Sequence, residues 1–405
     1  MTHTLTVTRL GDLGDGLADG IVVPAALPRE TVEGTLVDGR LSSPRILSPS
    51  PERVKAPCAH AGGCGGCAVQ HASDNLVSDW KRDRVVEALW AHGVEAEVGE
   101  PITSPPGSRR RAGFAGRRTK KGAIVGFHGR ASHTLIPVPN CLVVTEKLRA
   151  VLPILEVMTL AGGSRKGEIA FQVTETDTGL DVAAKGGKAL DLGLHQQLVD
   201  LGARIGLARL TWNGETVAQW APPTVSFGQA KVLLPPGAFL QATREGETAL
   251  VDFVKSALSG ASRVADLFCG CGTFALPLAA SAEVLAVEGE RAQTEALAQA
   301  ARHTQRLRAV TAETRDLFKR PLLAEELSKF DGVVIDPPRW GAAAQVAELA
   351  KSKVPRIASV SCNPTTFARD AASLIASGYG MGSVTVVDQF RWSPHVELAA
   401  LFTRA

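Results

Sequence analysis

The sequence lacks any long hydrophobic segment. No uninterrupted apolar run approaches the roughly 18–20 residues that a membrane span needs, so we expect no contact with a membrane. The first residues, MTHTLTVTRLGDLGDG, contain neither the basic nor the apolar part of a secretory signal, and we therefore expect a cytoplasmic protein. A short repeat is also missing. With 45% hydrophobic and 21% charged residues, a disordered chain, a collagen and a coiled coil are excluded.

Acidic residues are absent from positions 101–145, although the whole chain has a net charge of only +3. Eight basic residues lie in this stretch: Arg109, Arg110, Arg111, Arg117, Arg118, Lys120, Lys121 and Arg130. Such a local excess of positive charge attracts polyanions. Charge alone leaves a second interpretation open, in which these side chains form a solvated face or pair with acids elsewhere in the chain.

The length of 405 residues predicts two or three domains. Three short strand-like segments between Thr4 and Val37, separated by turns, predict a small OB-like β-barrel over residues 1–52. A Ser- and Pro-rich linker ends this barrel. Residues 53–235 then combine a cysteine cluster, a helix from about Asn75 to Ala91 and mixed strands and loops, which predicts a central α+β domain.

Residues 236–405 alternate strand-like segments with Ala-rich helical ones. This alternation predicts the fold class α/β, with a doubly wound, mostly parallel, Rossmann-like sheet. The last two strand-like segments, GSVTVVDQF and HVELAALF, lie close together and predict an antiparallel hairpin at the end of the domain.

A Gly-rich turn follows the first predicted strand of this domain, in the segment DLFCGCGTFALPL from Asp266 to Leu278. Glycines allow a ligand to approach the backbone, and Glu288 ends the next strand where it can accept hydrogen bonds from a ribose. The segment does not match the dinucleotide pattern G-x-G-x-x-G. It resembles the S-adenosylmethionine loop of Rossmann-like methyltransferases, and the alternative is an ordinary tight turn between a strand and a helix.

Two further acids follow predicted strands at the same edge. Asp336 opens the sequence DPPR directly after the fourth strand, so we expect it to face the ligand cleft. Asp316 comes just after the third strand. It is a candidate for the adenine amino group, or it caps the N-terminus of a helix.

Cys362, in the sequence SCNP, ends the fifth predicted strand at this edge. It is either a small buried residue or a nucleophile. Carbon 5 of uracil is a poor nucleophile until a thiolate adds to carbon 6, and a base must later remove the proton from carbon 5. Glu397 is an isolated acid in the apolar run VELAALF, so it is a candidate for this base. His395 is interpreted as a surface histidine.

Three of the seven cysteines are closely spaced, as Cys58-x5-Cys64-x2-Cys67, with glycines between them. In a chain without an export signal this spacing predicts metal binding rather than disulfides. Cys141 is the candidate fourth ligand. Four thiolates suit a [4Fe-4S] cluster or a structural zinc ion. Paired C-x2-C motifs, which are common in zinc sites, are missing, and this favours iron–sulfur.

Together these motifs resemble the RNA uracil-5-methyltransferase family, and in particular its iron–sulfur 23S rRNA members, over residues 55–405. The resemblance implies S-adenosylmethionine as cofactor and identifies Cys362 as nucleophile and Glu397 as general base. It further implies a cofactor site formed by Gln241, Phe268, Thr273, Glu288, Asp316 and Asp336, and a cluster held by Cys58, Cys64, Cys67 and Cys141. The N-terminal barrel is similar to the TRAM domain, but its six acids and four basic residues in positions 1–50 do not favour RNA binding.

RNA is the partner that the resemblance implies, with 23S rRNA preferred over tRNA, and we expect a monomer. We assign RNA contacts to Arg109, Arg110, Arg111, Arg117, Arg118, Lys120 and Lys121. The alternatives are amino-group methylation, cytosine-5 methylation and a non-catalytic iron–sulfur RNA-binding protein. Arg339 and the pair of Cys362 and Glu397 argue against the first and the last, and Trp340 stands where cytosine-5 enzymes commonly carry a second cysteine.

Overall fold

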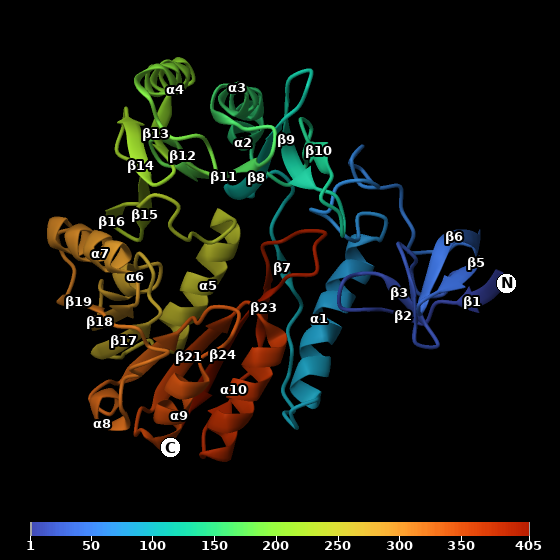
Figure 1. Cartoon of the computed structure of the whole chain (residues 1–405). Coiled ribbons are helices and arrows are strands. Elements are labelled where there is room, and N and C mark those ends of the chain that lie inside the picture. The colour runs from blue at the N-terminus through green and yellow to red at the C-terminus, as the bar shows by residue number, and fades with distance from the viewer. Residues whose placement is uncertain (1, 405) are drawn as a thin grey trace.

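The structure is a computed structural model that describes residues 2–404, and it begins with a six-stranded sheet (Figure 1). Its strand order is β1-β5-β6-β4-β3-β2. The strands are β1 (Thr2–Thr6), β2 (Arg9–Leu10), β3 (Gly16–Ala18), β4 (Ile21–Val23), β5 (Thr31–Val37) and β6 (Arg40–Ser48). Val7, Val23, Val32 and Leu41 form its small core. The predicted strands therefore share one sheet, and its assignment as an OB-like barrel stays a prediction.

Helix α1 (Asp74–Trp90) follows the cysteine cluster. Ser73 caps it by accepting a hydrogen bond from the backbone N–H of Leu76, and the predicted helix is confirmed to within one residue at each end. The helix lies beside α10 (Pro364–Ala376), far along the chain (Figure 1). Val85 and Leu89 of α1 are buried in the same apolar cluster as Phe367 and Leu374 of α10.

The central region contains a seven-stranded sheet of order β10-β9-β8-β11-β12-β13-β14. These strands are β8 (Arg111–Arg118), β9 (Ala123–His128), β10 (Leu135–Pro137), β11 (Glu168–Thr176), β12 (Gly179–Lys185), β13 (Leu207–Trp212) and β14 (Glu215–Gln219). The helices are α2 (Glu146–Ala150), α3 (Leu152–Gly162) and α4 (Leu192–Arg204). Phe114, Phe171 and Val182 of the sheet pack with Leu155 and Leu198 of the helices, so α3 and α4 cover one face and leave the other uncovered.

The C-terminal sheet has the order β19-β18-β17-β20-β21-β24-β23-β7, and β22 also pairs with β24. Its strands are β7 (Ile102–Thr103), β17 (Arg263–Leu267), β18 (Glu283–Glu288), β19 (Val310–Thr314), β20 (Gly332–Ile335), β21 (Arg356–Ser361), β22 (Gly380–Met381), β23 (Thr385–Asp388) and β24 (Glu397–Thr403). The pairs from β19 to β21 are parallel, whereas β24 is antiparallel to both of its main neighbours. This confirms the predicted doubly wound sheet and the C-terminal hairpin.

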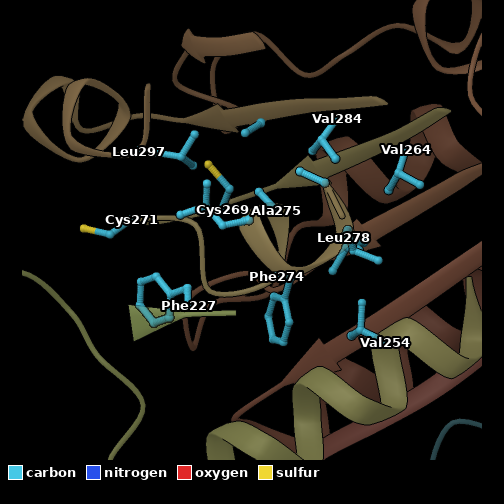
Figure 2. Close-up of a cluster of buried hydrophobic side chains, with 14 of the residues drawn as sticks. Phe227, Val254, Val264, Cys269, Cys271, Phe274, Ala275, Leu278, Val284 and Leu297 are labelled. Carbon is cyan, nitrogen blue, oxygen red and sulfur yellow. The ribbon is translucent and has the colours of Figure 1, made fainter. Parts of the chain in front are cut away.

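The remaining helices flank this sheet: α5 (Arg244–Ala257), α6 (Ala275–Leu278), α7 (Arg291–His303), α8 (Ala324–Leu327) and α9 (Ala343–Lys351). The chain crosses from one side of the sheet to the other between β17 and β20, which is the place where such folds bind ligands. Cys269 and Cys271 are buried among the apolar side chains below this point (Figure 2). Their environment explains why they are packing residues rather than ligands.

A hairpin before the predicted boundary at residue 236 packs on the C-terminal sheet. The hairpin of β15 (Thr224–Phe227) and β16 (Ala230–Leu233) contributes Phe227 and Val232 to the core of this unit. Strand β7 pairs in parallel with β23 at the edge of the same sheet. No helix in the described range 2–404 is both long and apolar enough to cross a membrane.

Candidate active site

A cavity of about 790 Å³ opens at the carboxyl edge of the C-terminal sheet. The ends of β17, β18, β20 and β21 and the start of β24 meet here. Seven of the predicted catalytic and cofactor-binding residues line it, together with Arg109: Gln241, Phe268, Glu288, Asp316, Asp336, Cys362 and Glu397. Thr273 lies in the Gly-rich loop but not on the cavity wall formed by residues 2–404.

The Gly-rich loop after β17 is a tight turn with left-handed backbone angles. Gly270 and Gly272 have φ angles of 54° and 100°, and Phe268 has a φ of 62° that a residue with a side chain rarely adopts. The backbone N–H groups of Gly270 and Glu290 donate to the two carboxylate oxygens of Glu288, at 3.1 and 3.0 Å. The loop and the end of β18 are thereby fixed to each other.

Asp266, at the end of β17, lies beneath this loop and is fully buried. Neither of its carboxyl oxygens has a hydrogen-bond partner within residues 2–404. Burial, and secondarily the nearby Asp336, raise its pKa well above the usual range. In the sequence, Asp266 is marked only as the first residue of the loop motif. An unpaired buried acid at the turn is the kind of group that a bound ligand or its water can satisfy.

The far side of the cavity is aromatic. The rings of Phe268 and Phe318 are 5.3 Å apart and tilted, and Phe318 is 48% exposed. Asp316 accepts hydrogen bonds from the backbone N–H groups of Phe318 and Lys319, so it caps a turn and not a helix. Phe318 was missed in the sequence because no spacing signal marks an exposed phenylalanine in a turn.

Cys362 lies between β21 and α10, where Asn363 caps the helix by accepting from the N–H of Thr365. The side-chain amide of Asn363 donates to the carbonyl of Arg339 at 2.9 Å, which joins the SCNP and DPPR segments. Burial raises the pKa of Cys362 to about 12, with a further contribution from Glu397 and Asp336. The thiol is therefore protonated in these surroundings.

Glu397 is the first residue of β24 and is 4% exposed. Burial raises its pKa well above the usual range, and the charge of Asp336 adds to this rise, whereas a hydrogen bond with Gln389 opposes it. The amide of Gln389 also donates to Gln241 Oε1 at 2.5 Å. Burial raises the pKa of Asp336 itself to about 7. Asp336 therefore changes its protonation state near neutral pH, and Glu397 holds its proton to higher pH than an ordinary carboxyl group.

The basic residues predicted to contact RNA have different environments. Arg110 is 2% exposed, pairs with Glu247 and donates to the carbonyl of Gln241. Its side chain is thus used inside the protein, which does not favour the predicted contact with RNA. Arg117 pairs with Glu168. Arg118, Lys120 and Lys121 lie in the β8–β9 hairpin, where both lysines are exposed.

Arg109 lies between two cavities. It lines the cavity of Cys362 and also a second cavity of about 230 Å³ that is lined by all four predicted cluster ligands, Cys58, Cys64, Cys67 and Cys141. Its guanidinium stands over the ring of Phe390, 5.6 Å from the centroid. Within residues 2–404, no three His, Cys, Asp or Glu side chains are close enough to share one metal ion.

The architecture is found in a known enzyme structure. Pyrococcus abyssi tRNA (uracil-54, C5)-methyltransferase, solved in complex with S-adenosyl-L-homocysteine, superposes with a TM-score of 0.77 at 24% identity, over 99% of both chains. With its Gly-rich loop and acids at the switch point, the C-terminal unit has the fold of the Rossmann-like, S-adenosylmethionine-dependent methyltransferases.

Sequence comparisons define the protein further. Residues 233–405 match the family model described as tRNA (Uracil-5-)-methyltransferase. An uncharacterized RNA methyltransferase of Rhizobium meliloti is 46% identical over 98% of this chain and 99% of that protein. The 23S rRNA (uracil(1939)-C(5))-methyltransferase RlmD of Halomonas elongata is 34% identical over 97% of this chain and 88% of that protein. The chain belongs to the RNA uracil-5-methyltransferase family, as the motifs predict, and is an enzyme that uses S-adenosylmethionine.

Proposed function

We propose that the protein methylates carbon 5 of a uridine in 23S rRNA through a covalent bond between Cys362 and carbon 6. The observation that carries this proposal is that Cys362 and Glu397 open into the same cavity as Phe268 and Glu288. A nucleophile and a base for the uracil therefore lie next to the residues proposed to hold the cofactor.

In the proposed reaction, a thiol adds to the uracil ring before methylation and is released after it. Cys362 gives its proton to solvent as the RNA binds, its Sγ bonds to carbon 6, and the electron pair moves to carbon 5 and the neighbouring carbonyl. S-adenosylmethionine, when bound, would supply the methyl group that carbon 5 takes up and would leave as S-adenosylhomocysteine. Glu397 then removes the proton from carbon 5, and the bond from Sγ to carbon 6 breaks to restore the ring and the thiolate.

The cavity controls when this chemistry starts. With a pKa of about 12, the thiol of Cys362 gives up its proton only when a bound substrate changes its surroundings. Glu397, whose pKa is also raised, is a strong base once it has lost its own proton. Burial is the main cause of both shifts, and the protonated thiol is a poor nucleophile until a substrate is bound.

We prefer 23S rRNA as substrate because RlmD of Halomonas elongata resembles the chain along its whole length. The fold alone does not separate the two substrates, since the Pyrococcus abyssi tRNA enzyme superposes on 99% of this chain. tRNA is therefore the second candidate.

We also propose that Cys58, Cys64, Cys67 and Cys141 hold a [4Fe-4S] cluster. The four side chains surround one cavity of about 230 Å³. Four cysteine side chains around one space suit a cysteine-bound cluster, and the absence of paired C-x2-C motifs favours it over zinc. Cys141 is buried between β10 and α2, so the cluster would join the cysteine segment to the central sheet.

This arrangement predicts a structural role for the cluster. We expect Cys64→Ala to lower thermal stability and soluble yield more than it lowers the methylation rate of the protein that remains folded. Iron content, thermal midpoint and single-turnover rate of the purified variant measure the three effects. A variant that keeps the wild-type midpoint but has no activity would contradict a structural role.

Nucleoside mass spectrometry tests the reaction and its substrate together. Unmodified large-subunit rRNA and tRNA, kept apart, are incubated with the protein and S-adenosylmethionine. We expect 5-methyluridine in the rRNA and none with Cys362→Ala. The product in tRNA alone would overturn the substrate assignment. An active Cys362→Ala variant would overturn the covalent mechanism.

A further inference from the structure

The uncovered face of the central sheet carries a second large cavity, of about 680 Å³. Its floor consists of small side chains on neighbouring strands, including Gly113 and Ala115 of β8, Ala170 of β11 and Ala183 of β12. We call this cavity the sheet trough. Its volume falls within the roughly 300–1,000 Å³ that ligand sites have.

A buried hydroxyl group in the sheet trough lacks a partner. Thr211 of β13 is 3% exposed and lines the trough, opposite Ala183 in the strand register. Its Oγ1 has no hydrogen-bond partner within residues 2–404. Buried hydroxyl groups in folded proteins almost always have one. The unsatisfied hydroxyl therefore indicates that a polar ligand group enters the trough.

The sheet trough adjoins the active-site cavity. Pro236 and Gly237 line the trough, and Phe239 and Gln241 of the same short segment line the active-site cavity. The guanidinium of Arg111 stands over the ring of Phe239, 5.5 Å from its centroid. Phe239 is 55% exposed, and Arg111 Nε has no partner within residues 2–404. A strand that leaves the active site here meets an aromatic face and an available cation.

Charge around the sheet trough suits a polyanion. Glu168 at its far end is paired with Arg117 and with His128. Asp181, next to the trough on β12, is buried in an ion pair with Arg209 at 2.8 Å. Lys185 lines the trough, is exposed and has no acidic partner among the residues that the structure describes. The acids are thus neutralised, and positive charge remains on the rim.

We propose that the sheet trough binds unpaired nucleotides of the substrate RNA that flank the target uridine. The proposal rests on the proposed function, because it takes the adjoining cavity as the uridine site. The Thr211 hydroxyl contacts a base or ribose, and Lys185 and Arg111 face phosphates. Recognition of unpaired bases by a sheet face with adjacent cations is a common mode of RNA binding.

Substitutions at Ala170 and Thr211 test the sheet trough. Ala170 is exposed on its floor, so Ala170→Glu and Ala170→Lys place opposite charges at one point without disturbing the core. We expect Ala170→Glu to raise KM for large-subunit rRNA about tenfold, with kcat and the KM for S-adenosylmethionine within about twofold of wild type. Ala170→Lys should leave KM within about twofold.

Thr211→Val removes only the hydroxyl and should raise KM about two- to tenfold, as the loss of one hydrogen bond does. Thr311→Val, at an exposed position of β19 in the other sheet, is the matched control and should have no effect. Wild-type KM in both Ala170→Glu and Thr211→Val would overturn the proposal. A change of oligomeric state in Ala170→Glu would also overturn it, by making the trough an interface between copies of the chain.

Crosslinking separates this proposal from the proposed function. An rRNA transcript that contains 4-thiouridine is irradiated with the protein, and the crosslinked peptides are mapped. We expect crosslinks to β8, β11, β12 or β13, and crosslinks confined to other elements would overturn the proposal. Because this readout needs no methylation, crosslinks in the trough with no 5-methyluridine would refute the proposed function alone. Methylation without such crosslinks would refute the trough alone.

Discussion

At the scale of single residues, the proposed mechanism gives Cys362 and Glu397 separate steps of one reaction, nucleophilic addition and proton removal. In the proposed mechanism Glu397 acts only after the methyl group has been added, when the proton leaves carbon 5. Glu397→Gln keeps the size of the side chain and removes its basicity, so we expect it to trap the protein–RNA adduct. The measurement is a denaturing gel with labelled RNA, in which a slowly migrating band should accumulate. The double variant Cys362→Ala/Glu397→Gln is the control, and a band in that lane would contradict the role of Cys362.

Asp266 makes stability depend on pH. Its pKa is raised in the folded protein, so the unfolded chain releases this proton at lower pH. Its stability contribution is complete below the unfolded pKa of about 4 and is lost as the pH rises toward the folded pKa. Asp266→Asn has no such loss. As the pH rises from 5 to 8, we expect the thermal midpoint of Asp266→Asn to rise relative to that of wild type. The difference between their free energies of unfolding should grow by up to ~1.4 kcal/mol per pH unit.

The matched control for this measurement is Asp252→Asn, at an exposed position of α5. Its difference from wild type should stay constant over the same range of pH. If the Asp266→Asn difference is also constant, the Asp266 carboxyl is not held protonated in the folded state.

At the scale of elements, α1 supports the loop that precedes Glu397. Lys81 is completely buried and forms an ion pair with Asp388 of β23 at 2.5 Å, and its ammonium also donates to the carbonyl of Phe390. The backbone N–H groups of Ala68 and Val69 donate to the carbonyl of Trp392 in the same loop. The segment after the cysteines and the start of α1 thus fix the backbone that leads to Glu397.

Lys81→Met should therefore be strongly destabilising. It leaves Asp388 buried without a partner, which costs about 3–5 kcal/mol, and the thermal midpoint should fall by several degrees. Lys81→Met/Asp388→Asn should recover part of the loss. Arg82→Met, on the same helix, breaks only surface pairs with Asp79 and Glu100 and should cost less than about 1 kcal/mol. Equal losses in Lys81→Met and Arg82→Met would show that burial of the pair is unimportant.

The sequence predicted the elements whose signals are local. The alternation of strands and helices, the helix predicted from about Asn75 to Ala91 and the acids at strand ends were sufficient to place α1, the parallel sheet and most of the active-site cavity. Ion pairs between residues far apart in the sequence were not predictable, because they leave no local sequence pattern. Lys81 pairs with Asp388 from the opposite end of the chain, and the burial of Arg110 depends on Glu247 of α5, so a count of charges assigned Arg110 to the surface.

At the scale of the whole molecule, positive charge should determine how RNA affinity responds to salt. Arg118, Lys120 and Lys121 of the β8–β9 hairpin have no ion pair among residues 2–404. Replacing all three by Ala should weaken RNA binding and reduce the slope of log affinity against log salt by about 0.7–0.9 for each phosphate that the protein no longer neutralises. Fluorescence anisotropy with labelled rRNA between low and moderate salt measures this slope.

A second triple variant controls for net charge. Arg302, Arg306 and Arg308 are exposed at and beyond the end of α7, and replacing them by Ala removes the same charge away from both cavities. Its salt slope should match wild type. Equal effects of the two triple variants would mean that RNA responds to overall charge and not to the hairpin.

The position of β7 and α1 has a consequence for the order of synthesis. Both are translated before the C-terminal sheet, yet β7 completes its edge and α1 packs on α10 near the other end of the chain. During translation the apolar side of α1 and the backbone of β7 remain without their partners, α10 and β23, until almost the whole catalytic half has been made. The nascent chain therefore exposes these surfaces for most of its synthesis, and the catalytic half cannot close its sheet without a segment made long before it.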